Sequence, residues 1–240
     1  MTEAYTVLGD PAAPILIISD HASNHVPSGI DLGVPPDVMT QHMAIDIGVA
    51  AVAQLLVEQG DFCAILGGVS RLVIDYNRAP GDVGFVPVIS DGHTIEGNKV
   101  PDVTDRVVRF YDPYHAEAAR LVAQPQQPFI LSLHSFTPQL QSQPEEARPW
   151  EIGILYNEDD RAARIAIPLL EQAGLVVGDQ EPYSGKTLNA SMDRHAEANG
   201  RPYLGVELRQ DLIGAPDGQR RFAALLAPIL RTCREHFSGK

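Results

Sequence analysis

The feature that most limits how this chain can fold is a set of short, apolar runs. Residues 13–19 (APILIIS) carry no polar side chain before the final serine. Such a run is typical of a strand that is buried on both faces, as in a parallel sheet covered by helices. Similar runs predict further strands at 62–66, 72–74, 129–133, 152–156, 175–177 and 203–208.

Segments with helical spacing of apolar residues alternate with these runs. They are residues 36–58, 103–123, 159–172 and 220–237, whereas residues 77–101 are rich in Gly, Pro and Asp and predict an irregular excursion. This alternation predicts an α/β fold with a mixed, mostly parallel sheet and helices on both faces. Because no linker, repeat or low-complexity tract divides the chain, we expect residues 1–240 to form a single domain.

Charge and composition narrow the function classes. Eighteen Lys and Arg against 31 Asp and Glu give a formal charge of −13, which disfavours nucleic acid and anionic membranes as partners. No apolar run approaches the ~20 residues of a membrane span, and residues 1–10 do not form a secretory signal. We therefore expect a cytoplasmic protein. Cys63 and Cys233 lack the spacing of a disulfide framework or zinc finger, and oligomeric state is not predicted.

Polar residues collect where the predicted strands end. His21 follows the first strand, Asn77 and Arg78 follow the third, His134 follows the fourth, and Glu207 lies at the end of the last. Open α/β sheets place their sites at the carboxyl ends of the strands. Two imidazoles at neighbouring strand ends suit zinc, which in a catalytic site takes a third protein ligand and leaves a position open for water.

Two residues are candidates for the third ligand. Asn24 lies three residues after His21, but an amide oxygen is a poor zinc ligand. Asp46, in the predicted helix 36–58, offers an anionic oxygen, and His42 would lie one helical turn before it on the same face. Asp46 could also be a capping or salt-bridge residue.

Several segments resemble those of the N-formylglutamate amidohydrolase family. They are DHASNHVP (20–27), HMAIDIG (42–48), SRLVIDYNR (70–78), SLHSFTP (132–138), EPYSG (181–185), DRHAEANG (193–200) and GVELRQDLI (205–213). The segments follow one another in the same order and span nearly the whole chain. More distantly, they resemble segments of zinc carboxypeptidases and aspartoacylases.

The resemblance implies roles for individual residues. His21 and His134 match the two histidine ligands, and Glu207 matches the general base. Asn77 and Arg78 match the pair that binds a substrate carboxylate. Together they imply a metal-dependent amidohydrolase with one divalent ion, most simply zinc.

One residue departs from the pattern of the related peptidases. Asn24 stands where they have a ligand glutamate. Three explanations are open: Asp46 supplies the missing carboxylate, the metal is bound more weakly, or catalysis has been lost.

The expected chemistry agrees with these residue types. Amide hydrolysis at neutral pH requires a nucleophile stronger than water, and zinc provides one by lowering the pKa of bound water. Glu207 would take a proton from that water and pass it to the leaving amine. In the structural alternative, Glu207 is an ion-pair partner of Arg209 or of another guanidinium.

A planar guanidinium at Arg78 can hold a carboxylate through two hydrogen bonds, which predicts a small-molecule carboxylate as substrate. The alternative for Arg78 is an ion pair with Asp75 or Asp82. Further candidates for the substrate pocket are Arg71, His195 and Tyr183.

The leading hypothesis is removal of a formyl or small acyl group from an N-acylated acidic amino acid such as N-formylglutamate. A zinc peptidase or peptidoglycan amidase, and a non-catalytic metal- or amino-acid-binding protein, are the alternatives. The chain contains no Gly-x-Ser-x-Gly elbow, no Gly-x-Gly-x-x-Gly fingerprint and no Walker sequence. Serine hydrolase, dinucleotide and NTP chemistry therefore lack their usual support.

Overall fold

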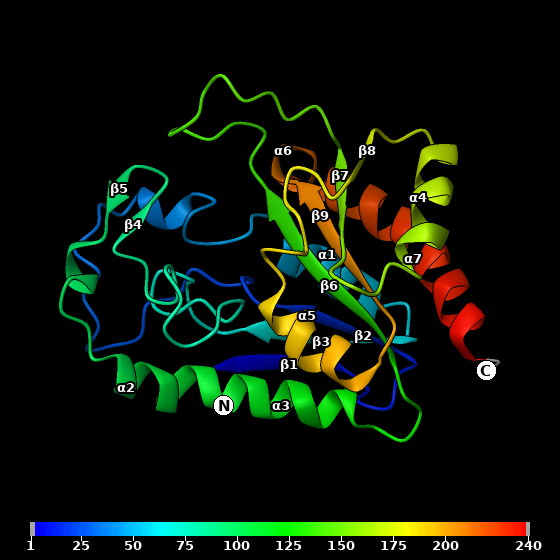
Figure 1. Cartoon of the computed structure of the whole chain (residues 1–240), viewed down its shortest axis with the longest axis horizontal. Helices are drawn as coiled ribbons and strands as arrows, with labels where there is room; N and C mark the ends of the chain where they lie inside the picture. Colours follow the sequence, from blue (N-terminus) through cyan, green and yellow to red (C-terminus); the bar gives the residue numbers. More distant parts are fainter. Residues whose placement is uncertain (1–2, 239–240) are drawn as a thin grey trace.

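The computed structural model describes residues 3–238 of the chain, with a seven-stranded sheet at its centre (Figure 1). The strands are β1 (Tyr5–Gly9), β2 (Ile15–Ser19), β3 (Phe62–Gly67), β6 (Phe129–Phe136), β7 (Ile152–Leu155), β8 (Val177–Asp179) and β9 (Tyr203–Arg209). They lie in the order β1-β3-β2-β6-β9-β7-β8. β3, β2, β6 and β9 are parallel, whereas β1 and β7 run antiparallel to β3 and β9. The predicted mixed, mostly parallel sheet is confirmed.

Helices cover both faces of this sheet. They are α1 (Val49–Val57), α2 (Val103–Arg106), the π-helical turn η3 (Val107–Tyr111), α3 (Asp112–Val122), α4 (Ala163–Gln172), α5 (Ala190–His195), α6 (Gln210–Ile213) and α7 (Pro216–Ser238). Short 3₁₀ turns lie at η1 (Val38–Thr40), η2 (Glu96–Asn98) and η4 (Glu197–Asn199). Within the described residues, no helix is both long and apolar enough to cross a membrane.

The apolar run of β2 is buried on both sides, as the sequence predicts. Ile15 and Ile17 pack in a cluster with residues of α1, α4 and α7. Leu16 and Ile18 face the other way and pack with Tyr114 of α3 and its neighbours. A strand between two helical layers has no solvent face, which explains the absence of alternating polar residues.

Two predicted elements are wrong. Residues 36–48 do not continue the helix that begins at Val49, because Gly48 takes a left-handed conformation (φ 87°) and lies directly against the backbone of Ile213. Residues 72–74 form a buried turn instead of a strand: Val73 donates its backbone N–H to the carbonyl of Ser70 (2.8 Å). Short buried apolar runs do not distinguish strands from turns by periodicity.

Irregular segments extend beyond the edge where β2, β6 and β9 end (Figure 1). They are residues 20–48, residues 68–101, which include the hairpin β4 (Ile89–Ser90) and β5 (His93–Thr94), and the loop 137–149. Asp91, at the hairpin turn, accepts hydrogen bonds from the backbone N–H groups of Gln141 (3.0 Å) and Ser142 (2.9 Å). This contact joins the hairpin to the loop 137–149 beside the carboxyl ends of the central strands.

Candidate metal centre and substrate pocket

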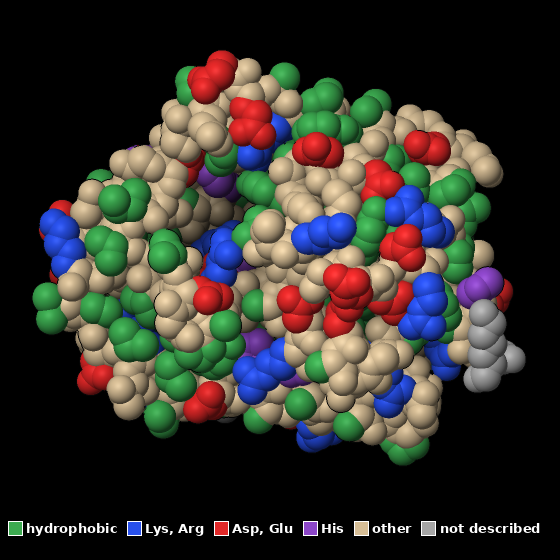
Figure 2. Space-filling view, viewed as in Figure 1, with side chains coloured by type: hydrophobic (Ala, Val, Ile, Leu, Met, Phe, Trp, Pro, Cys, Tyr) green, Lys and Arg blue, Asp and Glu red, His purple; other side chains and the backbone are tan. Residues whose placement is uncertain are grey.

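A cavity of about 170 Å³ lies at the carboxyl ends of β2, β6 and β9. Figure 2 shows the molecule hollowed in this region, with histidine and basic side chains on the walls. The lining residues are His21, His42, Asp46, Arg71, Asn77, Arg78, His134, Ser135, Phe136, Thr137, Tyr183, Leu188 and Glu207. Pockets for drug-sized ligands are typically about 300–1,000 Å³, so this cavity fits a small molecule.

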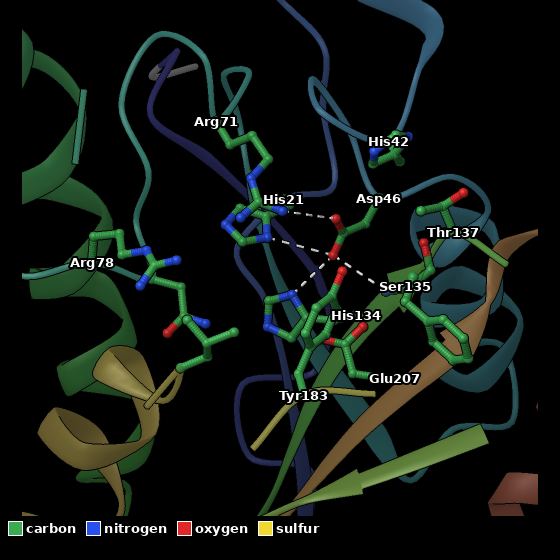
Figure 3. A pocket seen from close by; sticks show the side chains of 13 residues that line it. His21, His42, Asp46, Arg71, Arg78, His134, Ser135, Thr137, Tyr183 and Glu207 are labelled. Carbon is green, nitrogen blue, oxygen red and sulfur yellow. Dashed lines mark hydrogen bonds and ion pairs between the residues drawn. The ribbon is translucent and has the colours of Figure 1, made fainter. Parts of the chain in front are cut away.

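Three buried side chains converge inside the cavity (Figure 3). His134 Nδ1 lies 2.9 Å and His21 Nδ1 lies 3.5 Å from the same oxygen, Oδ2 of Asp46. Each of the three residues offers one ligand atom, and these atoms all lie within 4.8 Å of one another. Two imidazole nitrogens and one carboxylate oxygen are the donor types that a catalytic zinc ion takes.

The backbone around Asp46 fixes the position of its carboxylate. The Asp46 N–H donates to the carbonyl of His21 (3.0 Å), directly after β2. The Ser135 N–H, in β6, donates to Asp46 Oδ2 (3.2 Å). These two hydrogen bonds hold Asp46 between the ends of β2 and β6. Two residues later, Gly48 ends the irregular segment and α1 begins.

The outer nitrogen of each histidine faces a buried carboxylate. His21 Nε2 hydrogen-bonds Asp75 Oδ1 (2.7 Å), and His134 Nε2 lies 3.4 Å from Asp20 Oδ2. The hydroxyl of Tyr114 donates to Asp20 (2.7 Å) and helps to fix it. Carboxylates behind ligand histidines orient the imidazole rings and increase their basicity. From the sequence, Asp75 was expected only as an ion-pair partner of Arg78, and Asp20 had no expected role. The one available signal was the presence of Asp20 in the segment DHASNHVP and of Asp75 in the segment SRLVIDYNR.

The charges of the cluster suit a bound cation. His21 Nδ1 is buried and has no hydrogen-bond partner among the described residues. Burial and Arg71 lower the pKa of His21, but Asp75 and Asp46 raise it more, so the net shift is upward. Burial alone would raise the pKa of Asp46, yet His21 and His134 hold it well below its usual range. An ionised carboxylate between two imidazoles therefore fits a divalent ion.

Glu207 lies beside this cluster. In β9 it pairs in register with His134 of β6, which brings both side chains to the cavity. Its Oε2 atom is buried and has no hydrogen-bond partner among residues 3–238. Burial raises the pKa of Glu207 to about 7. The alternative ion pair with Arg209 is not formed, because Arg209 binds Asp211 instead (2.9 Å).

Basic and amide side chains line the other wall of the cavity. Arg71 is engaged by Asp75 (2.9 Å) and lies 3.5 Å from Asp46. Arg78 lines the cavity, and in the described part of the chain it forms no ion pair, either with Asp75 or with Asp82. The side-chain oxygen of Asn77 accepts a hydrogen bond from the backbone N–H of Ser191 (2.9 Å), and its amide nitrogen has no hydrogen-bond partner among residues 3–238. Arg78 is thus a free guanidinium at the cavity wall.

Comparison with known proteins agrees with this arrangement. The family model described as N-formylglutamate amidohydrolase matches residues 13–214. The chain belongs to the N-formylglutamate amidohydrolase family. The matched range contains the cluster His21, Asp46 and His134 together with Glu207. No curated protein matched the chain in sequence.

Solved structures extend the comparison of this family member. A gene product of Agrobacterium tumefaciens is 30% identical, with a TM-score of 0.87 over 97% of this chain and 95% of that chain. An N-formylglutamate amidohydrolase from Ralstonia eutropha is 19% identical, with a TM-score of 0.70 over 98% of this chain and 99% of that chain. An aspartoacylase family protein from Mesorhizobium loti is 14% identical, with a TM-score of 0.37 over 93% of this chain and 60% of that chain. The second shows a shared fold, and the third is too dissimilar to support an argument.

Two predicted site residues lie outside the cavity of this N-formylglutamate amidohydrolase family member. Asn24 is exposed, and its amide nitrogen donates to the carbonyl of Met39 (2.8 Å). It therefore points away from the cluster, and Asp46 is the third residue there. His195 is buried against His115, with Nε2 2.8 Å from His115 Nδ1, and does not line the cavity. Tyr183 and Arg71 do line it.

Proposed function

We propose that this chain is a metal-dependent amidohydrolase that removes a formyl or small acyl group from an N-acylated acidic amino acid such as N-formylglutamate. One observation carries the proposal: Glu207 Oε2, a buried oxygen without a hydrogen-bond partner among residues 3–238, stands beside the His21, Asp46 and His134 cluster in a small cavity. A base, three metal-type ligands and a free guanidinium at Arg78 are the groups that hydrolysis of a carboxylate-bearing amide requires.

His21, Asp46 and His134 would hold the divalent ion, and zinc suits these donors best. When bound, the ion supplies a Lewis acid that polarises the amide carbonyl and makes water more acidic. Glu207 takes a proton from the attacking water and delivers it to the departing nitrogen. Burial raises the pKa of this carboxyl above its ordinary value, which favours a group that first accepts a proton and then returns it.

Arg78 and Asn77 would bind a substrate carboxylate. The guanidinium can donate two parallel hydrogen bonds to a carboxylate, and the Asn77 amide nitrogen can donate a third. Arg71 is held by Asp75 and Asp46, so it contributes positive charge without being free to move toward the substrate. The cavity of about 170 Å³ favours an amino-acid derivative over a polymer such as peptidoglycan.

Formate release from N-formylglutamate tests this proposal. The assay would use zinc-loaded protein, protein treated with a chelator, and chelated protein to which zinc has been restored. N-formylnorvaline, which has no side-chain carboxylate, serves as the matched substrate. We expect release that is abolished by chelation, restored by zinc and faster for N-formylglutamate. Absence of formate release from zinc-loaded protein with either substrate would overturn the proposal.

A further inference from the structure

Arg148, at the end of the loop 137–149, is a buried cation that the proposed chemistry has not used. Its side chain is 2% exposed. Nη1 donates a hydrogen bond to the hydroxyl oxygen of Tyr183 (2.9 Å), and the guanidinium carbon lies 5.0 Å from the centre of the same ring. Arg148 therefore holds Tyr183 through both its hydroxyl and its aromatic face.

The positive charge of Arg148 is poorly neutralised. Its Nε atom is buried without a hydrogen-bond partner among the described residues. The carboxylate paired with it, Glu146, lies 3.7 Å from Nη2, beyond hydrogen-bond distance, and is 43% exposed. A buried cation without a close anion is costly. The electrostatic field of the Arg148 guanidinium therefore acts on the adjacent Tyr183 side chain, which lines the cavity.

A second Arg–Tyr pair on the surface provides a comparison. Arg164 lies over the ring of Tyr156 at 5.0 Å and hydrogen-bonds its hydroxyl. There, however, Arg164 also binds Asp160 (3.0 Å) and Asp179 (2.9 Å). The charge of Arg164 is neutralised by two carboxylates, and the surface pair lies outside the cavity. The charge of Arg148 is not neutralised in this way, and Tyr183 lines the cavity.

The hydroxyl of Tyr183 is available to a ligand. Tyr183 lines the cavity together with His134 and Glu207, and Figure 3 draws its side chain among theirs. Because Arg148 donates to the phenol oxygen, the phenol hydrogen is not needed for that bond, and no acceptor for it is found among residues 3–238. Burial and Glu207 raise the pKa of Tyr183 while Arg148 lowers it, with a net upward shift, so the phenol keeps its proton at neutral pH.

We propose that Tyr183 donates a hydrogen bond to the oxygen of the scissile carbonyl as negative charge develops there, and that Arg148 is the positioning residue that holds and polarises this phenol. The inference rests on the proposed function. As the water oxygen bonds to the carbonyl carbon, the π pair of the C=O bond moves to oxygen, and the proton lost by water goes to Glu207. Tyr183 keeps its own proton throughout. A preorganised donor acts only where charge develops, and a neighbouring cation strengthens it.

A double-mutant cycle tests this pair, with kcat and KM measured for N-formylglutamate. Tyr183→Phe should lower kcat by about 100-fold and leave KM within about threefold, as for loss of one oxyanion donor. Arg148→Met should lower kcat by about tenfold, since it acts through Tyr183. The double variant should be no slower than Tyr183→Phe alone. If Arg148→Met does not fold, Arg148→Gln, which keeps a donor but loses the charge, takes its place in the cycle.

The surface pair gives the matched controls. Arg164→Met and Tyr156→Phe should leave kcat and KM unchanged, and zinc content should equal that of the wild type in every variant. Arg148→Met with normal kcat, or a double variant whose loss is the product of the two single losses, would overturn this inference alone. Wild-type protein that releases no formate would instead overturn the proposed function, and the role of the pair with it.

Discussion

Glu207 is the side chain on which the proposed hydrolysis most depends. Gln is nearly the same size but cannot accept a proton, so Glu207→Gln should lower kcat by about 10²–10⁴-fold. Melting temperature and zinc content should stay close to those of the wild type, because Glu207 makes no ion pair with Arg209. Turnover, zinc content and melting temperature would be measured on one preparation. Normal turnover by folded, zinc-loaded Glu207→Gln protein would rule out this base.

Arg78 is the side chain on which binding of the substrate carboxylate most depends. Arg78→Lys keeps the charge and loses the planar pair of donors. We expect kcat/KM for N-formylglutamate to fall by the equivalent of about 2 kcal/mol or more. Arg220→Lys, at an exposed position on α7, is the control and should leave kcat/KM unchanged. Equal kinetics for Arg78→Lys and wild type would place the substrate carboxylate elsewhere.

Residue types at strand ends predicted that His21, His134 and Glu207 meet in the cavity, but not which other side chains join them or their detailed partners. His21, His134 and Glu207 follow or end buried strands, so their positions are fixed by the sheet. Asn24 is five residues beyond the end of β2, where the chain has already left the sheet, and spacing alone did not show that it turns outward. Arg148 lies in a loop rich in Gln and Pro, and its contact with Tyr183 joins residues 35 positions apart.

At the scale of elements, strands β2, β3, β6, β7, β8 and β9 were predictable, β8 with a shift of two residues, whereas β1 and the segments that carry Asp46 and Arg71 were not. Residues 36–48 and 68–79 contribute side chains such as Val38, Ala44 and Val73 to the core, but apart from the turn η1 they form no regular element. Their conformation is set by contacts with distant segments, such as the Asp46 N–H to the His21 carbonyl and the Ser70 hydroxyl to the Ala44 carbonyl (2.8 Å). A local pattern does not encode such contacts.

Gly48 is the element boundary that places Asp46. Its φ of 87° disfavours other residues, and a Cβ atom there would overlap the backbone of Ile213. Gly48→Ala should lower the free energy of unfolding by about 3 kcal/mol or more and weaken zinc binding. Gly60→Ala is the matched control, because Gly60 has a similar φ of 91° with nothing within 4 Å. It should cost only about 1 kcal/mol. Equal losses in urea unfolding would show that the close approach to Ile213 has no role.

At the scale of the whole molecule, the buried His115–His195 pair makes stability depend on pH. Burial lowers the pKa of His115 to about 3 and that of His195 to about 4, below the ordinary value of 6.5. Between pH 4 and pH 6.5, these two histidines are protonated in the unfolded chain but neutral in the folded chain. The contribution of this pair to the free energy of unfolding is therefore largest above pH 6.5 and falls as the pH is lowered toward 4.

Urea unfolding of chelator-treated protein measures this effect. Between about pH 7.5 and about pH 5, each histidine should cost about 1–2 kcal/mol. His195→Gln removes one titrating group, so its loss of stability over the same interval should be smaller by that amount. Wild type and variant share the titration of His21 and His134, which cancels in the comparison. Identical pH dependence in the two proteins would contradict the lowered pKa of His195.

Metal stoichiometry most directly tests whether the buried cluster is the metal centre of a hydrolase. Zinc per chain would be measured by elemental analysis in the wild type and in His21→Ala, Asp46→Ala and His134→Ala, after each folded protein is loaded with zinc and excess zinc is removed. His25→Ala, at an exposed histidine close to His21, is the control. We predict about one zinc ion per chain in the wild type and control, and almost none in the three cluster variants. Equal zinc content in all five proteins would contradict the assignment of this cluster.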